Sequence, residues 1–247
     1  MERDVFDTYE RAPEDFWYAK TRNELVRHLI KKYHPKFKDV LDCGCGTGFN
    51  YPSFRDAKRV VSLDISDYAL KICKKQCIPN LVKGDAQKMP FKNNTFDVVA
   101  AIELIEHLDD DRAALREFFR VLRPGGIVVL TTPAFGWLWS DDDVLAHHKR
   151  RYVRKDLIRK VRAAGFDLPF VSYRYFFLFL PTAIFFSVKN LWRKIFKGKP
   201  RNSLEDSPNN SVLASVMRAE NALLTRGTKF PFGVGFVCLL RKPKIVS

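Results

Sequence analysis

The chain has 247 residues and a formal net charge of +15, and this length suffices for one large domain with its own core. Five cysteines without a regular spacing exclude a disulfide framework, and no secretory signal pattern opens the chain, so we expect a reducing, cytoplasmic setting. Residues 1–140 carry 22 Lys and Arg against 20 Asp and Glu, whereas residues 141–247 carry 21 against 8. The second region should therefore attract anions, whether phosphates of nucleic acid, anionic lipid head groups or a phosphorylated substrate.

The first predicted element is a helix that follows the aromatic residues 16–18. Leu25, Val26, Leu29 and Ile30 recur at spacings of three and four, as they would on the buried face of a helix. We expect this helix to belong to an N-terminal cap that lies across a ligand site.

A glycine-rich turn follows the first predicted strand. Asp42 ends the strand, and three alternating glycines let the backbone turn sharply and approach a ligand where side chains would collide. The last of them, Gly48, comes one residue too early for the dinucleotide pattern G-x-G-x-x-G, which argues against NAD. The turn therefore indicates a different nucleotide-like cofactor.

Predicted strands alternate with helices between residues 40 and 175. This order favours a doubly wound α/β sheet with parallel pairing and right-handed crossovers. Helices are expected at 66–77, 110–121 and 154–164, and the last two strands at 168–174 and 234–240. Ligands should then bind beyond the carboxyl ends of the strands.

Five segments in this order resemble the class I S-adenosylmethionine (SAM)-dependent methyltransferases. They are the glycine loop at 40–50, the strand at 60–66, the loop at 83–86, the strand at 96–102 and the turn at 122–126. The resemblance implies SAM as cofactor and a Rossmann-like sheet of seven strands, mostly parallel with an antiparallel last strand, with helices on both faces. Its parts would be a helical cap at 1–35, a SAM-binding core at 36–174, a helical insertion at 175–230, and a final strand and tail at 231–247.

The same resemblance assigns cofactor contacts. Asp64 would bind both ribose hydroxyls, and Asp85 would bind the exocyclic amine of adenine. Trp17 and Arg22 would close over the cofactor and its methionine carboxylate. The planar guanidinium of Arg22 can bind a carboxylate through two hydrogen bonds. The alternative is that the aromatic residues only pack in the core. The other implied contacts are Asp42, Gly44, Cys45, Gly46, Gly48, Ile65, Ala86 and Glu103.

Glu103, Glu106 and His107 follow the strand at 96–102. At the start of a helix they would share one face, which is how a divalent ion could be held. The pattern resembles the E-x-x-E-H of ubiquinone-type O-methyltransferases, where these residues bind a metal that polarises a hydroxyl. Many methyltransferases instead keep a Glu-His pair without a metal, so that the acid positions SAM and the histidine orders the loop. Glu106 and His107 are catalytic candidates.

A long loop, residues 131–152, follows the fifth predicted strand. It resembles a stretch of methyltransferases of cell-surface glycan and lipid pathways. Trp137 and Trp139 would form an apolar wall for the acceptor. Arg150 and Arg151 would hold an anionic group such as a phosphate, unless this pair is a surface feature.

The end of the same loop supplies further catalytic candidates. His147 or His148 is the candidate base, because an imidazole accepts a proton near neutral pH. Tyr152 is a candidate beside them. The alternative for one histidine is that it caps the following helix.

The predicted insertion combines an apolar and a basic segment. Residues 175–188 hold no charge, but they are fewer than the roughly 20 that span a bilayer, and Pro181 interrupts them. Residues 189–201 hold six Lys and Arg and no acid, with Trp192 and Phe196 between them. Such a sequence suits the surface of an anionic membrane. The alternatives are a buried helix with a basic face and a lid over an apolar substrate tunnel.

We therefore expect SAM-dependent methyl transfer to a hydroxyl, or else a carbon or nitrogen, of an apolar or lipid-linked anionic acceptor. The enzyme would be cytoplasmic and peripheral at the inner face of the membrane. A small soluble acceptor and a non-catalytic SAM-binding or membrane-docking module are alternatives. Methylation of nucleic acid is disfavoured, because residues 102–105 lack the Asn/Asp-Pro-Pro-Tyr/Phe motif that handles a base amine. The sequence does not indicate an oligomeric state.

Overall fold

The computed structural model describes residues 16–196 and 210–244, with the backbone alone for residues 190–196. Seven strands form one sheet in the order β3-β2-β1-β4-β5-β7-β6. The strands are β1 Asp39–Cys43, β2 Arg59–Asp64, β3 Leu81–Lys83, β4 Phe96–Ile102, β5 Leu122–Pro133, β6 Asp167–Arg174 and β7 Gly235–Arg241. β7 pairs antiparallel with both β5 and β6, whereas the other neighbours pair in parallel. The predicted Rossmann-like sheet with an antiparallel last strand is confirmed.

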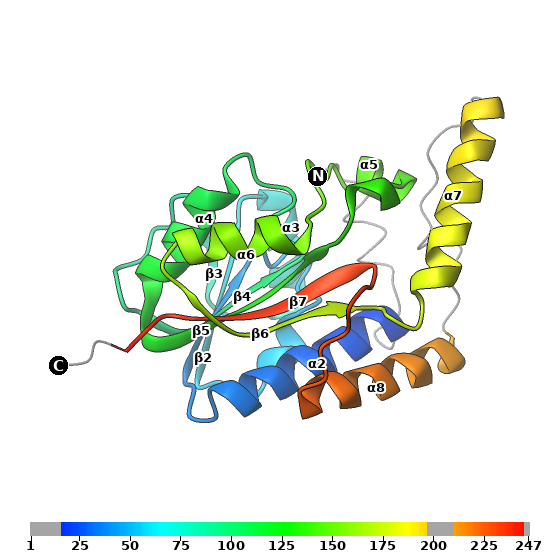
Figure 1. The fold of residues 1–247 in the computed structure, drawn as a ribbon. Helices are drawn as coiled ribbons and strands as arrows, with labels where there is room; N and C mark the ends of the chain where they lie inside the picture. The colour runs from blue at the N-terminus through cyan, green and yellow to red at the C-terminus, as the bar shows by residue number, and fades with distance from the viewer. Residues whose placement is uncertain (1–15, 197–209, 245–247) are drawn as a thin grey trace.

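Helices cover both faces of this sheet (Figure 1). They are α2 Trp17–Tyr33, α3 Asp67–Lys75, α4 Asp111–Val121, α5 Asp141–Leu145, α6 Arg154–Ala163, α7 Phe179–Phe196 and α8 Ser211–Arg226, with 3-10 turns η1 Tyr51–Phe54 and η2 Gly136–Leu138. α4 and α6 lie on one face, and α2 and α8 lie on the opposite face (Figure 1). Ser66 and Asp110 cap the starts of α3 and α4, because their side chains accept hydrogen bonds from backbone N–H groups of the first turn.

The core lies along the central strands. Residues 98–101 of β4, 127–130 of β5 and 236–240 of β7 have essentially no exposed surface. Strands that are covered on both faces have continuous apolar sequences, and these three segments have such sequences. Each such Val, Leu, Ile or Phe contributes about 1.5–3 kcal/mol relative to an exposed side chain.

α8 packs along α2 and extends the layer on that face. Asn221 Nδ2 donates to the Thr21 carbonyl (2.8 Å), and Lys32 Nζ donates to the Thr225 carbonyl (2.6 Å). The second half of the predicted insertion is therefore part of the body of the fold. α7, by contrast, projects past the edge of the sheet (Figure 1).

One condition named from the sequence is not met, and one local prediction is wrong. Residues 103–107 form a turn with Glu103 at a left-handed φ of 49°, and α4 begins only at Asp111, so Glu103, Glu106 and His107 do not share a helical face. Residues 122–126 are not a turn before the fifth strand. They are the first part of β5 itself, and the pairing register with β4 shifts between Phe96 and Val98.

Candidate functional site

The site begins at the carboxyl end of β1, where the glycine loop leaves the sheet. Gly44, Gly46 and Gly48 all have positive φ values (72°, 53° and 87°), which residues with a side chain rarely adopt. A Cβ on Gly44 would lie 2.6 Å from Leu104 Cδ1, whereas a Cβ on Gly46 would meet nothing within 4 Å. Gly44 therefore allows close packing, and Gly46 leaves space beside the backbone for a ligand.

Two carboxylates lie beside this loop. Asp64, the last residue of β2, accepts hydrogen bonds from the backbone N–H groups of Gly46 (2.8 Å) and Ser66 (2.9 Å). Asp42 is fully buried, and neither carboxylate oxygen has a hydrogen-bond partner among the described residues. Burial, and then the negative charge of Asp64, raises the pKa of Asp42 to about 7. An unpartnered buried carboxylate suits a cationic group of a ligand.

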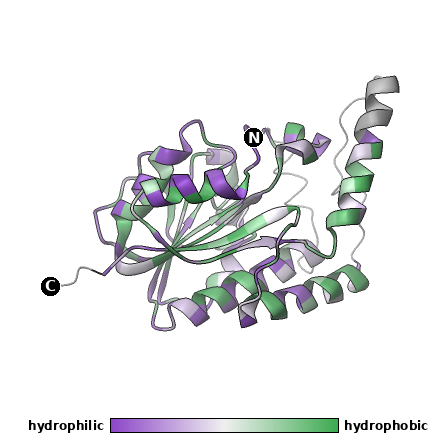
Figure 2. Ribbon diagram, in the orientation of Figure 1, coloured by the Kyte–Doolittle hydropathy of each residue, from purple (hydrophilic) through white to green (hydrophobic). Residues whose placement is uncertain are grey.

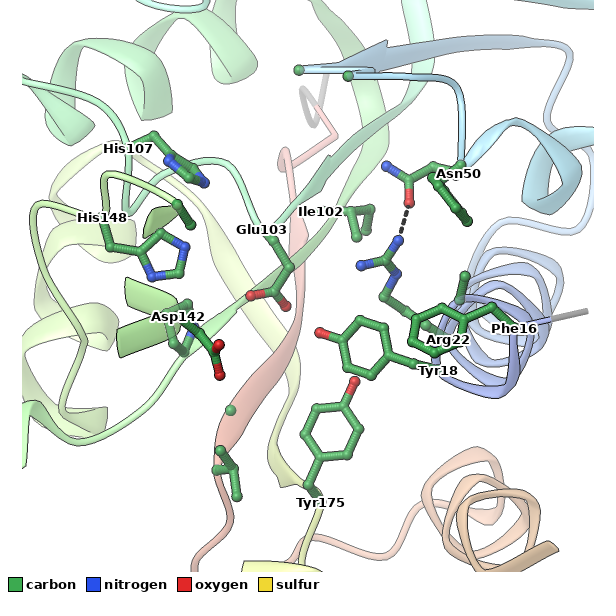
Figure 3. Close-up of a pocket in the computed structure, with 18 of the residues that line it drawn as sticks. Phe16, Tyr18, Arg22, Asn50, Ile102, Glu103, His107, Asp142, His148 and Tyr175 are labelled. Carbon is green, nitrogen blue, oxygen red and sulfur yellow. Dashed lines mark hydrogen bonds between the residues drawn. The ribbon is translucent and has the colours of Figure 1, made fainter. Parts of the chain in front are cut away.

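A cavity of about 380 Å³ opens next to the loop (Figure 3). Its walls come from the start of α2, the glycine loop, the turn after β4, the loop after β5 with α5, and the segment from β6 into α7. The lining residues include Phe16, Trp17, Tyr18, Arg22, Gly44, Cys45, Gly46, Asn50, Glu103, His107, Asp142, His148, Arg151, Tyr175, Leu178, Thr182 and Phe186. The cavity lies at the carboxyl ends of parallel strands, where open α/β sheets bind ligands.

The first turns of α2 form one wall of the cavity. Arg22 Nη2 donates to Asn50 Oδ1 (2.9 Å), which holds the guanidinium beside the glycine loop (Figure 3). Tyr18 stacks on Tyr175, with ring centroids 5.7 Å apart and planes inclined by 12°. Trp17 lines the same wall. Both α2 residues that the sequence predicted, Trp17 and Arg22, thus reach the cavity.

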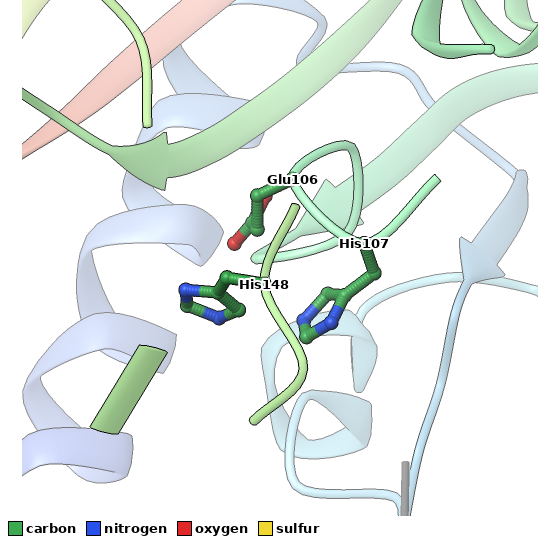
Figure 4. A group of neighbouring side chains, drawn as sticks. All are labelled: Glu106, His107 and His148. Atoms are coloured by element: carbon green, nitrogen blue, oxygen red, sulfur yellow. The ribbon is translucent and has the colours of Figure 1, made fainter. Parts of the chain in front are cut away.

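Glu106, His107 and His148 form a cluster beside the cavity (Figure 4). One potential ligand atom from each lies within 4.8 Å of the others. Glu106 is fully buried, and its Oε2 accepts from Thr132 Oγ1 (3.0 Å), while Oε1 has no partner among the residues described. Of the three candidate ligands named from the sequence, the structure groups Glu106 and His107 with His148 and not with Glu103. His148 takes the place of Glu103, whose carboxylate points into the cavity (Figure 3).

Burial controls the charges in this cluster. Burial raises the pKa of Glu106 well above its ordinary value, and the nearby Glu103 adds to the rise. Burial also lowers the pKa of His107 to about 3, and His148 adds to the fall. Both shifts favour uncharged forms, so His107 is a neutral imidazole that is a poor proton acceptor but has a lone pair that can bind a cation.

Asp143 holds two cavity residues in place. Its Oδ1 lies 2.8 Å from His148 Nδ1, and its two oxygens accept from Arg151 Nε (2.8 Å) and Nη2 (2.7 Å). Burial opposes ionisation of Asp143, yet hydrogen bonds from His148 and Arg151 hold its pKa below the usual range. Because a carboxylate only accepts hydrogen bonds, Nδ1 of His148 carries the hydrogen and Nε2 is left as the proton acceptor.

Tyr152 and Arg150 lie away from the cavity. Tyr152 is buried, and its hydroxyl lies 2.7 Å from Asp111 Oδ2. Arg150 pairs with the same carboxylate (3.2 Å) and donates to the Leu108 carbonyl (2.8 Å). These contacts tie the loop to the start of α4. The predicted catalytic role of Tyr152 and the predicted acceptor contact of Arg150 are therefore corrected to structural roles.

His147 and the two tryptophans also lie outside the cavity walls. His147 is exposed at a left-handed φ of 55°, and Trp137 is 60% exposed beside Phe135 and Phe179. Trp139 is half-buried and does not line the cavity. The apolar wall expected of the tryptophans is formed by Leu145, Tyr175, Leu178 and Phe186.

The remaining predicted cofactor contacts surround the ends of β2 and β3. Ile65 is 66% exposed next to Asp64, Asp85 accepts from the backbone of Gln87 (2.8 Å), and Ala86 is buried. None of the three lines the cavity. The space at the glycine loop, the unpartnered carboxylate of Asp42 and this second group of residues fit a cofactor with a cationic end and a nucleoside end.

Several cavity residues were not predicted from the sequence. Tyr18 stands one helical turn before Arg22, so helical spacing alone could have placed it on the same wall. Asp143 and Tyr175 carry no local signal. Tyr175 lines the cavity and Asp143 holds His148 at its wall, because β5 and β6 end at the same edge of the sheet.

The parallel sheet, the glycine loop, the acid at the end of β2 and the polar cavity define a cofactor-dependent α/β enzyme. Residues 41–130 match the family model described as methyltransferase domain. Together with a relative of Mycolicibacterium smegmatis described as a probable S-adenosylmethionine-dependent methyltransferase, this match indicates a class I SAM-dependent methyltransferase, a family that implies SAM as the cofactor.

Three relatives illustrate the similarity. An uncharacterised protein of Methanocaldococcus jannaschii is 31% identical over 80% of this chain and 93% of its own. The sterol 24-C-methyltransferase of Schizosaccharomyces pombe is 32% identical over 52% of this chain and 39% of its own. The malonyl-[acyl-carrier protein] O-methyltransferase of Yersinia pestis is 37% identical over 53% of this chain and 50% of its own. The chain spans between 38% and 62% of the lengths of the first five curated relatives.

Solved structures share the fold. The [4+2]-cyclase SpnF superposes with a TM-score of 0.56 at 20% identity, covering 90% of this chain and 82% of that one. A SAM-dependent methyltransferase from Archaeoglobus fulgidus gives 0.54 at 19% identity, covering 90% and 96%. These two names describe different reactions, so the acceptor must be argued from the cavity.

Proposed function

We propose that this methyltransferase acts on a hydroxyl of an apolar, lipid-linked acceptor that carries an anionic group, at the surface of an anionic membrane. The observation that carries the proposal is the position of α7. One side of this helix lines the cavity, and the other side is exposed and apolar.

One side of α7, together with Leu178 just before the helix, faces the cavity. Leu178, Thr182 and Phe186 are spaced four apart and line the cavity. The exposed side carries large apolar residues at Leu180 (66% exposed), Ile184 (64%), Phe185 and Val188. Figure 2 shows the apolar colour on the projecting helix. Such a helix can bury its outer side in a bilayer surface while its inner side guides an apolar chain to the cavity.

Charge supports an anionic surface as the partner. The excess of Lys and Arg over residues 141–247 surrounds α7 in the sequence, and each cation near an anionic leaflet adds about 1 kcal/mol. The predicted basic run begins at Lys189, which pairs with Asp141 (3.4 Å). The side chains of the rest of the run lie outside the described residues. None of the helices in the described ranges is long and apolar enough to cross a bilayer.

The chemistry follows from the cavity. SAM supplies an activated methyl group, so the protein has to align the acceptor and remove its proton. His148 Nε2 accepts the hydroxyl proton, and Asp143 stabilises the imidazolium that forms. The Glu103 carboxylate and the Tyr18 hydroxyl lie around the same space and position the acceptor oxygen (Figure 3).

A divalent cation at Glu106, His107 and His148 is a second candidate for activating the hydroxyl. Two imidazoles and a carboxylate form a ligand set used by Zn²⁺ and Fe²⁺. A cation there would lower the pKa of the acceptor hydroxyl. Activity that survives EDTA would leave His148 as the base, whereas activity that EDTA abolishes and Zn²⁺ or Mn²⁺ restores would establish the cation.

The first test is cofactor binding. Isothermal titration with SAM and with its product S-adenosylhomocysteine should show micromolar affinity, and Asp64→Ala should lose it because the carboxylate fixes the glycine loop. Methyl transfer is then assayed with apolar alcohols that carry a phosphate or carboxylate, presented in anionic vesicles. Turnover of a water-soluble sugar or of RNA without turnover of these alcohols would contradict the proposal.

A further inference from the structure

One buried guanidinium has no hydrogen-bond or ion-pair partner among the residues that the structure describes. Arg174, the last residue of β6, is 1% exposed, and Nε, Nη1 and Nη2 all lack hydrogen-bond acceptors among the residues that the structure describes. A buried guanidinium normally gains ion pairs or several hydrogen bonds, since burial without them is costly. Three unsatisfied nitrogens on one side chain point to a ligand that supplies the acceptors.

The buried acid Glu220, whose carboxyl group interacts electrostatically with Arg174, does not satisfy this charge. Glu220 on α8 is fully buried, but its carboxylate accepts from the backbone N–H groups of Tyr175 (2.6 Å) and Phe177 (3.3 Å). No hydrogen bond joins the Arg174 guanidinium to Glu220 within the described parts of the chain. The positive charge of Arg174 opposes the burial that raises the pKa of Glu220, so the two groups interact only through space. Glu220 instead fixes the segment that leads into α7.

Tyr175 separates Arg174 from the cavity. The guanidinium carbon lies 4.5 Å from the centre of the Tyr175 ring, and this ring lines the cavity. Tyr175 has a left-handed φ of 58°, a conformation that costs a residue with a side chain about 1 kcal/mol or more. The cover over Arg174 is therefore one residue with a strained backbone.

We propose that Arg174 is an anion-binding residue at the base of the acceptor cavity, and that Tyr175 covers it until an anionic group of the acceptor displaces the ring. The ligand class is a phosphate or carboxylate on an apolar chain. This inference rests on the proposed function, because it places the anionic group of that acceptor. A guanidinium binds such an oxyanion through two parallel hydrogen bonds, which supply the acceptors that Arg174 lacks.

The test uses octyl phosphate as the probe, octyl glucoside as a neutral probe with the same chain, and inorganic phosphate as the group alone. Titration of the full chain saturated with S-adenosylhomocysteine should show binding of octyl phosphate. Arg174→Met should weaken that binding about ten- to a hundredfold and leave octyl glucoside unaffected. Arg159→Met, at an exposed arginine paired with Asp156 (2.6 Å), is the control and should bind octyl phosphate normally. Weaker binding of inorganic phosphate that is also lost in Arg174→Met would show that the residue recognises the anionic group itself.

A second variant changes the cover and keeps the charge. Tyr175→Gly accepts the left-handed φ and removes the ring, so octyl phosphate should bind several-fold tighter. Arg174→Met should also keep or raise the thermal midpoint, because an apolar residue replaces an unpaired buried charge. Equal affinity of octyl phosphate for the wild type and Arg174→Met, or no gain in Tyr175→Gly, would overturn the inference. If the wild type does not bind S-adenosylhomocysteine, the proposed function itself is contradicted, and this outcome is distinct from a failure of the Arg174 inference.

Discussion

The two ends of the site differ in how their polar groups are held. At the glycine loop, Asp64 binds backbone N–H groups from its own neighbourhood, and the geometry follows from residues close in sequence. At the acceptor end, His148 is fixed by Asp143, Tyr175 by Glu220 and α7 by its position beyond β6. The cofactor end is therefore a local motif, whereas the acceptor end depends on distant elements meeting at one edge of the sheet. This difference agrees with a shared cofactor and a variable acceptor.

The largest effect is expected at the acceptor end. His148→Ala removes the proposed base, so kcat should fall by about 10²- to 10⁴-fold while the affinity for SAM stays the same. Steady-state kinetics with the first acceptor that turns over would measure this. Asp143→Asn should lower kcat less, because the imidazole remains but loses the carboxylate that orients it. An equal loss of SAM affinity in His148→Ala would show that the two ends are not separable.

The next effect concerns stability at the cofactor end. In the unfolded chain the pKa of Asp42 should be near its ordinary value of 3.8, whereas in the folded protein it is about 7. The folded state therefore holds the extra proton between these values, and stability falls as pH rises through the window, by up to about 4 kcal/mol. Asp42→Asn should remove this slope. Urea unfolding of both proteins at pH 5 and pH 8 gives the difference, and identical slopes would contradict the raised pKa of Asp42.

Gly46 should show a smaller but specific loss. Gly46→Val places a side chain in the open space of the loop and forces a left-handed φ, so S-adenosylhomocysteine affinity should fall about a hundredfold. Gly136→Val is the matched control, since a Cβ there also meets nothing within 4 Å and the residue lies outside the cavity walls. A comparable loss in the control would mean that the effect is on folding and not on the cofactor site.

The smallest effect is expected on the outer side of α7. Leu180→Glu combined with Ile184→Glu should weaken binding to phosphatidylglycerol vesicles about tenfold, because both side chains are exposed and apolar. Val153→Glu makes the same change at an exposed position at the start of α6 and should leave vesicle binding intact. Cosedimentation measures both. If the α7 variant binds vesicles as the wild type does and still methylates a soluble acceptor, α7 is a lid over the cavity and not a membrane-binding helix.

The sequence by itself determined the alternation of strands and helices, the glycine loop and the acids near the ends of β1 and β2. Strand and turn signals are local, and three glycines with positive φ can be recognised from their spacing alone. The same local reasoning failed at residues 103–107, because the left-handed φ of Glu103 follows from the contacts of the turn and not from helical spacing. It also misplaced Tyr152, whose hydroxyl is taken up by Asp111.

Only the tertiary structure decided the acceptor side. His148 joins Glu106 and His107 because the loop after β5 crosses the turn after β4, and the backbone of Lys149 donates to the Glu106 carbonyl there (2.8 Å). Tyr175 stands far in the sequence from Tyr18 and Glu103, which line the same cavity, and reaches them through the pairing of β6 with β7. Contacts between residues so widely separated depend on packing of the whole sheet, which no local pattern of residues specifies.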